Sequence, residues 1–116
     1  MNGGGKIDTV RSRTSGVVGR ALNSARAQHF VLDSPSGPNE ALTNSEAFLA
    51  GISSCGVTLI EKYAQDSGIP VAGMEVTIQG VRSATEPRFD EIAVRYEIRG
   101  VDQATAERLV GVWRER

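Results

Sequence analysis

The stretch TNSEAFLAGISSCGVTLIEKYAQDSG, residues 43–68, predicts one long helix. Thr43 is a favourable N-cap residue, and Glu46, three positions later, completes a capping-box pattern. Gly68 tolerates the left-handed conformation that often ends a helix, and Pro70 cannot continue one. The segment therefore carries both a start signal and a stop signal.

Apolar side chains cover more than one face of this predicted helix. One stripe recurs at three- and four-residue steps and consists of Phe48, Ile52, Cys55, Leu59 and Tyr63. A helix that is apolar around most of its circumference is buried on most sides, so we expect this helix at the centre of the protein. Glycines lower helix propensity by about 1 kcal/mol relative to alanine. Gly51 and Gly56 therefore predict the close approach of another element beside Cys55.

The composition indicates one small globular domain over residues 1–116, with residues 1–6 as a flexible leader. The chain is 40% hydrophobic and 23% charged, which is ordinary for a soluble protein. A chain of this size buries only about two thirds of its unfolded surface. A long buried helix is a large apolar surface for so few residues to cover, and it therefore predicts a homodimer.

The net charge and the single cysteine limit the partners and the covalent links that we expect. The net charge of −1 argues against a nucleic-acid partner that binds through a basic face. We expect Arg11, Arg13, Arg20 and Arg26 to be solvated charges at strand edges. A single cysteine cannot form an intrachain disulfide, and it indicates a reducing, cytoplasmic location.

The sequence also gives no sign of a membrane segment, a metal site or a cofactor site. No stretch is apolar and long enough to span a membrane, and the first residues do not resemble a signal peptide. His29 and Cys55 are too few ligands for structural zinc. The glycines at residues 3–5 precede no helix, so they do not form a phosphate-binding loop.

The remaining segments predict an α+β fold. A three-stranded antiparallel meander precedes the central helix, and a β-hairpin and a second helix follow it. Asp102 is the expected cap of the second helix, which should run to Arg116 with an apolar stripe of Ala106, Leu109, Val110 and Trp113. The predicted strands are residues 7–14, 17–22, 28–33, 74–79 and 92–99, with turns at 15–16, 23–26 and 83–88 and a loop at 35–39.

Cys55 is the only candidate nucleophile, and two interpretations remain open. A free cysteine is usually a small core hydrophobe, and burial among apolar groups suppresses its ionisation. A reactive Cys55 would need a cation from another element, and Arg20 is the best-placed candidate. For Glu46 we expect a helix-capping role before a catalytic one. His29 is expected at a solvent-facing or edge position, and Trp113 and Tyr63 are expected in the core.

The segments SPSGPNEAL and TNSEAFLAGISSC, residues 34–42 and 43–55, resemble the OsmC/Ohr family of osmotically induced and organic-hydroperoxide-resistance proteins. The segments GIPVAGMEVTIQG, FDEIAVRYEIRGVD and AERLVGVWRER resemble the family's later hairpin and second helix, so the resemblance covers nearly the whole chain. It implies an intertwined α+β homodimer with paired central helices. It also implies that Cys55 is the peroxidatic thiol, which an organic hydroperoxide oxidises to a sulfenic acid. An external thiol or dithiol would be the reductant.

The chain departs from the family pattern at three points. The family's second cysteine follows the last helix, and this chain ends at Arg116, so we expect a truncated chain or a natural short form without the terminal strand. In the hydroperoxide-resistance branch the glutamate that orients the catalytic arginine falls where this chain has Ser45, and Glu46 matches other branches. That arginine would fall near Val17, with Arg20 at a neighbouring position. The alternative is a catalytically silent dimer that serves as a binding or scaffold protein, with Cys55 as a core residue.

Overall fold

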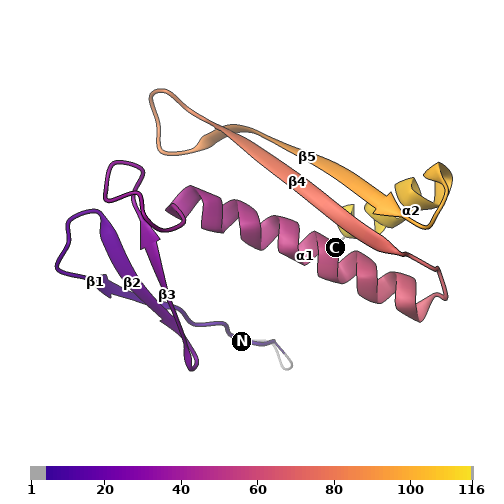
Figure 1. The fold of residues 1–116 in the computed structure, drawn as a ribbon, viewed down its shortest axis with the longest axis horizontal. Helices are drawn as coiled ribbons and strands as arrows, with labels where there is room; N and C mark the ends of the chain where they lie inside the picture. The colour runs from indigo at the N-terminus through magenta and orange to yellow at the C-terminus, as the bar shows by residue number, and fades with distance from the viewer. Residues whose placement is uncertain (1–4, 116) are drawn as a thin grey trace. The chain divides into compact units, whose positions relative to one another are not determined.

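The computed structural model describes residues 5–115 and divides into two compact units, Met1–Ala47 and Phe48–Arg116. Three strands precede a long helix, and two strands and a shorter helix follow it (Figure 1). This order confirms the predicted α+β class. Residues 1–4 of the predicted leader and Arg116 lie outside the described residues. The elements are β1 (Arg11–Thr14), β2 (Arg20–Ala25), β3 (Gln28–Asp33), α1 (Asn44–Asp66), β4 (Gly73–Arg82), β5 (Phe89–Arg99) and α2 (Gln103–Arg114).

The first unit contains an antiparallel sheet in the order β1-β2-β3, as predicted, but its strands are displaced. The prediction of a strand over residues 17–22 is wrong, because residues 15–19 form a turn and β2 begins at Arg20. The Val17 N–H donates to Ser15 Oγ at 3.0 Å, and the Arg20 N–H donates to the Val17 carbonyl at 3.2 Å. Gly16 and Gly19 supply the positive φ angles that this turn requires.

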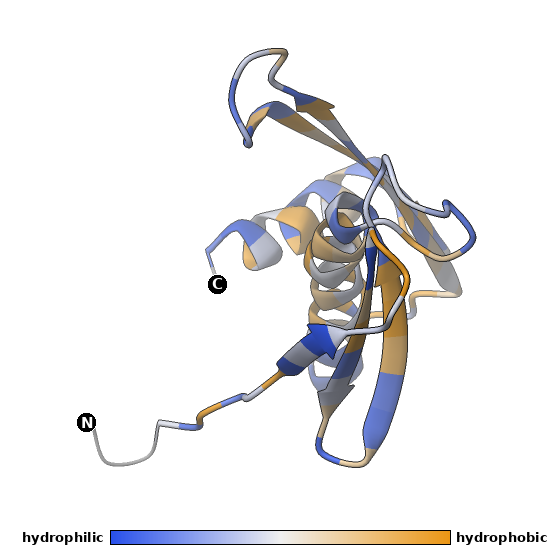
Figure 2. Cartoon of the chain, turned by 90° about the vertical axis from the view of Figure 1, so that its left-hand side faces the viewer, coloured by the Kyte–Doolittle hydropathy of each residue, from blue (hydrophilic) through white to orange (hydrophobic). Residues whose placement is uncertain are grey.

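The second turn of the meander also lies later than predicted. Asn23 pairs with Phe30 within the sheet, and the chain reverses at Arg26, whose φ is +56°. Burial differs between the residues of β3. Phe30 is 42% exposed, whereas Asp33 is completely buried. Figure 2 shows hydrophobic and hydrophilic residues mixed along β2 and β3.

The loop predicted at residues 35–39 lies close to the turn between β1 and β2. The Ser34 N–H donates to the Gly19 carbonyl at 2.7 Å. A Cβ atom added to Gly19 would lie 2.6 Å from Gly37 Cα, so the two backbones meet where neither residue can carry a side chain. This contact holds the loop that leads into α1.

Both predicted signals at the ends of α1 are confirmed. Glu46 N–H donates to Thr43 Oγ1 at 3.1 Å, and Thr43 N–H donates to Glu46 Oε1 at 2.9 Å, which is the reciprocal capping box. At the other end Gly68 has a φ of +71°, and the Ile69 N–H donates to the Ala64 carbonyl at 2.8 Å. This bond belongs to a Schellman motif, which satisfies the last carbonyls of the helix.

The expected burial of α1 around most of its circumference is wrong within one chain. Only Gly56, Ile60 and Ala64 are buried, and they lie at four-residue steps on a single face. The core of the second unit consists of Ile60, Ala64 and Leu109. The other apolar stripe of α1 is partly or fully open to solvent, and Phe48 is 57% exposed.

The hairpin and α2 follow the predicted pattern. Strands β4 and β5 pair from Gly73↔Arg99 to Arg82↔Phe89, with an irregularity between Val81 and Arg82. Apolar residues half-buried on one face alternate with exposed polar residues on the other along most of both strands. Asp102 caps α2 by accepting the Thr105 N–H at 2.8 Å. No helix among residues 5–115 is long and apolar enough to cross a membrane.

Candidate functional site

Cys55 is an exposed free thiol near the middle of α1. In a helix, side chains three and four positions apart share a face, which places Ile52 and Leu59 on either side of Cys55. Both neighbours are half-buried. Cys55 is therefore not part of the buried core of the second unit, which consists of Ile60, Ala64 and Leu109.

An aromatic pair, which the sequence did not indicate, lies on the same helix stripe as Cys55. The rings of Phe48 on α1 and Phe89 on β5 stack with centroids 6.1 Å apart and an interplanar angle of 17°. Phe48 keeps 57% of its surface exposed although it stacks on Phe89. The thiol therefore shares its helix face with aromatic and aliphatic surface, which suits an apolar group better than a charged one.

The neighbouring residue, Gly56, faces the core. A Cβ atom at this position would lie 2.6 Å from three ring carbons of Trp113, so the absence of a side chain lets the indole lie on the helix backbone. The rings of Trp113 and Tyr96 in turn pack edge to face, with centroids 5.3 Å apart. Burial raises the pKa of the Tyr96 hydroxyl above its ordinary value. The close approach predicted beside Cys55 is thus confirmed at Gly56, whereas a Cβ at Gly51 would meet no atom within 4 Å.

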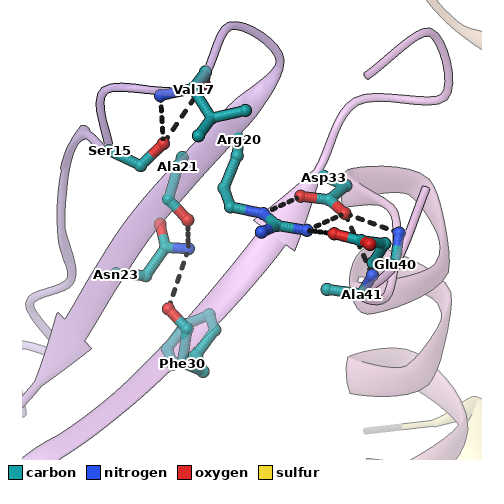
Figure 3. Close-up of polar contacts among 9 residues, drawn as sticks. All are labelled: Ser15, Val17, Arg20, Ala21, Asn23, Phe30, Asp33, Glu40 and Ala41. Atoms are coloured by element: carbon teal, nitrogen blue, oxygen red, sulfur yellow. Dashed lines mark hydrogen bonds and ion pairs between the residues drawn. The ribbon is translucent and has the colours of Figure 1, made fainter. Parts of the chain in front are cut away.

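Arg20 lies in a charged cluster of the first unit (Figure 3). Its Nε and Nη2 atoms donate to the two carboxylate oxygens of Asp33 at 2.7 and 2.9 Å, and Nη2 also donates to Glu40 at 3.0 Å. Asp33 Oδ2 also accepts the backbone N–H groups of Glu40 and Ala41. These donors, the Arg20 guanidinium first, hold the pKa of Asp33 well below its ordinary value.

The cluster fixes the segment between β3 and α1. Asp33 uses its side chain for the bonds above and its backbone N–H for the Leu42 carbonyl at 2.9 Å, and it forms an isolated bridge with Thr43. Sequence analysis selected Arg20 but missed Asp33 and Glu40. The register Arg20↔Asp33 brings the pair together, and the displaced prediction of β2 concealed it.

The other candidate residues have structural environments. Glu46 closes the capping box in the first unit, as expected. His29 is exposed on β3, an edge strand of its sheet, as expected. Tyr63 and Trp113 pack against the core cluster, as expected. Among residues 5–115, no group of three or more His, Cys, Asp or Glu side chains could hold a metal ion.

Comparison with solved structures shows the same fold in several bacterial proteins. An OsmC-like protein from Mycoplasma pneumoniae superposes with a TM-score of 0.85 at 15% identity, over 96% of this chain and 82% of that chain. A protein from Psychrobacter arcticus 273-4, named for osmotic stress induction and detoxification response, gives 0.80 at 20% identity over 94% and 83%. An organic hydroperoxide resistance protein OsmC from Legionella pneumophila gives 0.73 at 20% identity over 95% and 83%.

At these identities the structural likeness establishes the fold alone. No curated protein matches the sequence. The family described as OsmC-like protein matches residues 37–116, a range that begins in the loop before α1 and includes both helices and the hairpin. This match covers well over half of the chain and contains Cys55. The chain therefore belongs to the OsmC-like protein family.

Proposed function

We propose that this protein is a thiol-dependent peroxidase that reduces organic hydroperoxides through Cys55. The observation that carries the proposal is an exposed thiol in the middle of α1, on a stripe of aromatic and aliphatic side chains. Family membership and the name of the Legionella pneumophila neighbour support a redox or peroxide-resistance role.

The chemistry needs only the thiolate and the hydroperoxide in the first step. The Cys55 sulfur attacks the terminal oxygen of the hydroperoxide, an S–O bond forms, and the O–O bond breaks. The leaving alkoxide takes a proton and becomes an alcohol, while sulfur loses two electrons and becomes a sulfenic acid. An external dithiol then attacks this sulfur, releases water, and leaves as a disulfide when its second thiol displaces Cys55.

The surroundings of Cys55 favour a hydroperoxide with an apolar body. Phe48 and Phe89 offer stacked aromatic surface, and Ile52 and Leu59 flank the thiol on its own helix face. Hydrogen peroxide cannot use such contacts because it has no apolar part. Binding energy from these side chains would therefore raise turnover of organic hydroperoxides selectively.

Further parts of the proposal concern the cation, the oligomer and the location. Arg20, or another arginine of the N-terminal segment, would stabilise the thiolate. Glu46 would orient that arginine or cap α1. The exposed apolar residues, among them Phe48 and Leu42 at 57% each, argue for a second copy of the chain as a partner. We also propose a single domain over residues 1–116 and a cytoplasmic location.

The test is peroxide consumption by the full chain with cumene hydroperoxide and, separately, hydrogen peroxide. Cys55→Ser should abolish consumption of both. Phe48→Ala should lower kcat/KM for cumene hydroperoxide roughly tenfold, the effect of about 1.4 kcal/mol of lost contact, and leave hydrogen peroxide unchanged. Val81→Ala is the matched control, because Val81 is similarly exposed, at 55%, on the hairpin of the same unit. Full turnover by Cys55→Ser would refute the proposal.

One observation favours the alternative of a catalytically silent binding or scaffold protein. Arg20, the expected partner of the thiolate, is shared between the carboxylates of Asp33 and Glu40, which neutralise its charge. Under this alternative, Cys55 reacts with peroxide no faster than a free cysteine does, and organic and hydrogen peroxide react alike. Preference for the organic peroxide by an order of magnitude would exclude it.

A further inference from the structure

A second candidate site lies in the first unit, on one face of the sheet β1-β2-β3. A hollow of about 510 Å³ is open on this face. Residues directly opposite each other on antiparallel strands share a face, and residues two apart on a strand do so as well. The register therefore places two rows of side chains around the hollow. One row consists of Arg11, Ser24 and His29, and the other consists of Arg13, Leu22 and Val31.

The row between these two explains the floor of the hollow. Ser12, Asn23 and Phe30 also line it, yet their side chains point to the opposite face because they alternate with the two rows. Their backbone atoms therefore lie beneath the hollow, between the two rows. The hollow is thus bounded by side chains on two sides and by backbone atoms beneath.

The walls of the hollow carry positive charge without a matching carboxylate. Arg11 and Arg13 are exposed, and a guanidinium stays protonated at any ordinary pH. Among residues 5–115, neither arginine forms an ion pair, and no Asp or Glu lines the hollow. Arg20 lies on the same face but is paired with Asp33. His29 adds ring nitrogens that can bind an oxygen ligand.

Apolar surface lies between these polar groups. Leu22 is half-buried beside Arg13, and Val31 is 37% exposed in the same row. Figure 2 shows hydrophobic and hydrophilic residues adjoining on the strands of this unit. An oxyanion alone would leave this apolar surface in water, and an apolar molecule alone would leave two arginines without partners. A ligand with both parts satisfies both kinds of group.

We propose that this face binds a small anionic amphiphile, in which a carboxylate or phosphate head contacts Arg11 and Arg13 and a short alkyl chain covers Leu22 and Val31. The proposal concerns the first unit alone and does not depend on the chemistry of Cys55. Both head groups are oxyanions that arginine binds through paired N–H donors.

In the experiment, the 116-residue chain is titrated in a calorimeter with octanoate, octyl phosphate and octanol, at 50 mM and at 500 mM sodium chloride. Both anions should bind at least tenfold more tightly than octanol, and only their affinity should fall at high salt. The ratio of the two anions identifies the preferred head group. R11Q/R13Q should lose at least tenfold in affinity for the anions. Arg26→Gln is the matched control, since Arg26 lies at the β2–β3 turn outside the hollow.

A second variant tests the site without removing an arginine. Val31→Glu places a carboxylate among the wall residues and should also reduce anion binding at least tenfold. Cys55→Ser should bind both anions like the unmodified protein, so failure of the peroxidase proposal would leave this result intact. Octanol binding as tight as octanoate binding, unchanged affinity in R11Q/R13Q, or no binding of either anion would each overturn the proposal. In the last case, a change of sedimentation in R11Q/R13Q would identify a second copy as the occupant.

Discussion

Of the two glycines in α1, Gly56 is the one at which an added methyl group should destabilise the protein. Alanine in place of glycine normally stabilises a helix interior by about 1 kcal/mol. At Gly56 the new Cβ would lie 2.6 Å from three carbons of the Trp113 ring, well inside ordinary contact distance. Forced overpacking in a core costs about 1–3 kcal/mol. With 2 kcal/mol as the central value, Gly56→Ala should lower the free energy of unfolding by about 1 kcal/mol.

Gly51 provides the matched control on the same helix. A Cβ atom there meets no heavy atom within 4 Å, so Gly51→Ala should raise the free energy of unfolding by about 1 kcal/mol. The two alanine variants should therefore differ by about 2 kcal/mol. With an m value of about 2 kcal/mol/M in urea, their unfolding midpoints should lie about 1 M apart.

Urea unfolding followed by circular dichroism measures this difference. A double-mutant cycle isolates its cause: in a Trp113→Leu background the ring is gone, and Gly56→Ala should then stabilise the protein as Gly51→Ala does. The reasoning is refuted if Gly56→Ala and Gly51→Ala shift the midpoint equally. It is also refuted if the loss at Gly56 persists in the Trp113→Leu background.

Two further predictions concern the first unit and the start of α1. The pKa of Asp33 lies far below its ordinary value near 3.8, because the Arg20 guanidinium donates hydrogen bonds to the carboxylate. The ionised carboxylate therefore stabilises the fold at pH values above 3.8, and this stabilisation is lost progressively as the pH falls below 3.8. Unfolding midpoints of Asp33→Asn should therefore be lower at pH 6 and fall less between pH 5 and pH 2.5 than those of the unmodified protein. Asp66→Asn, which removes an exposed i,i+4 pair, should follow the unmodified protein; equal pH profiles for all three would contradict this account. Thr43→Ala should lose about 1 kcal/mol in urea unfolding, because the N–H of Glu46 loses its acceptor, and an unchanged midpoint would show that the capping box contributes nothing.

Local signals in the sequence were sufficient for much of the fold. Capping at Thr43 and Asp102 and termination at Gly68 depend on side chains and backbone angles within a few residues. The hairpin was equally readable, because alternation along β4 and β5 directly reflects one half-buried and one exposed face. These predictions needed no knowledge of distant contacts.

Predictions that depend on packing between elements were less successful. The apolar character of α1 predicted burial on most sides, yet α2 and the hairpin cover only the face of Gly56, Ile60 and Ala64 within one chain. The turn at residues 15–19 displaced β2, because Ser15 and two glycines determine its backbone more strongly than the valines favour a strand.

The candidate site was predicted in part. Cys55 followed from being the single cysteine of the chain, and its family resemblance gave it a role. The partners of Arg20 and the stack of Phe48 on Phe89 join residues that are distant in the sequence. Only the strand register and the packing of α1 on the hairpin reveal them.

The most direct test of the central claim is the trapping of sulfenic acid on the native, folded protein. The protein is mixed with one equivalent of cumene hydroperoxide or of hydrogen peroxide, quenched with a sulfenic-acid reagent, and weighed intact, with Cys55→Ser as the blank. The account predicts stoichiometric trapping at Cys55 at least tenfold faster with the organic hydroperoxide than with hydrogen peroxide. Trapping that is slow and equal for both peroxides would contradict it and would identify Cys55 as an ordinary thiol.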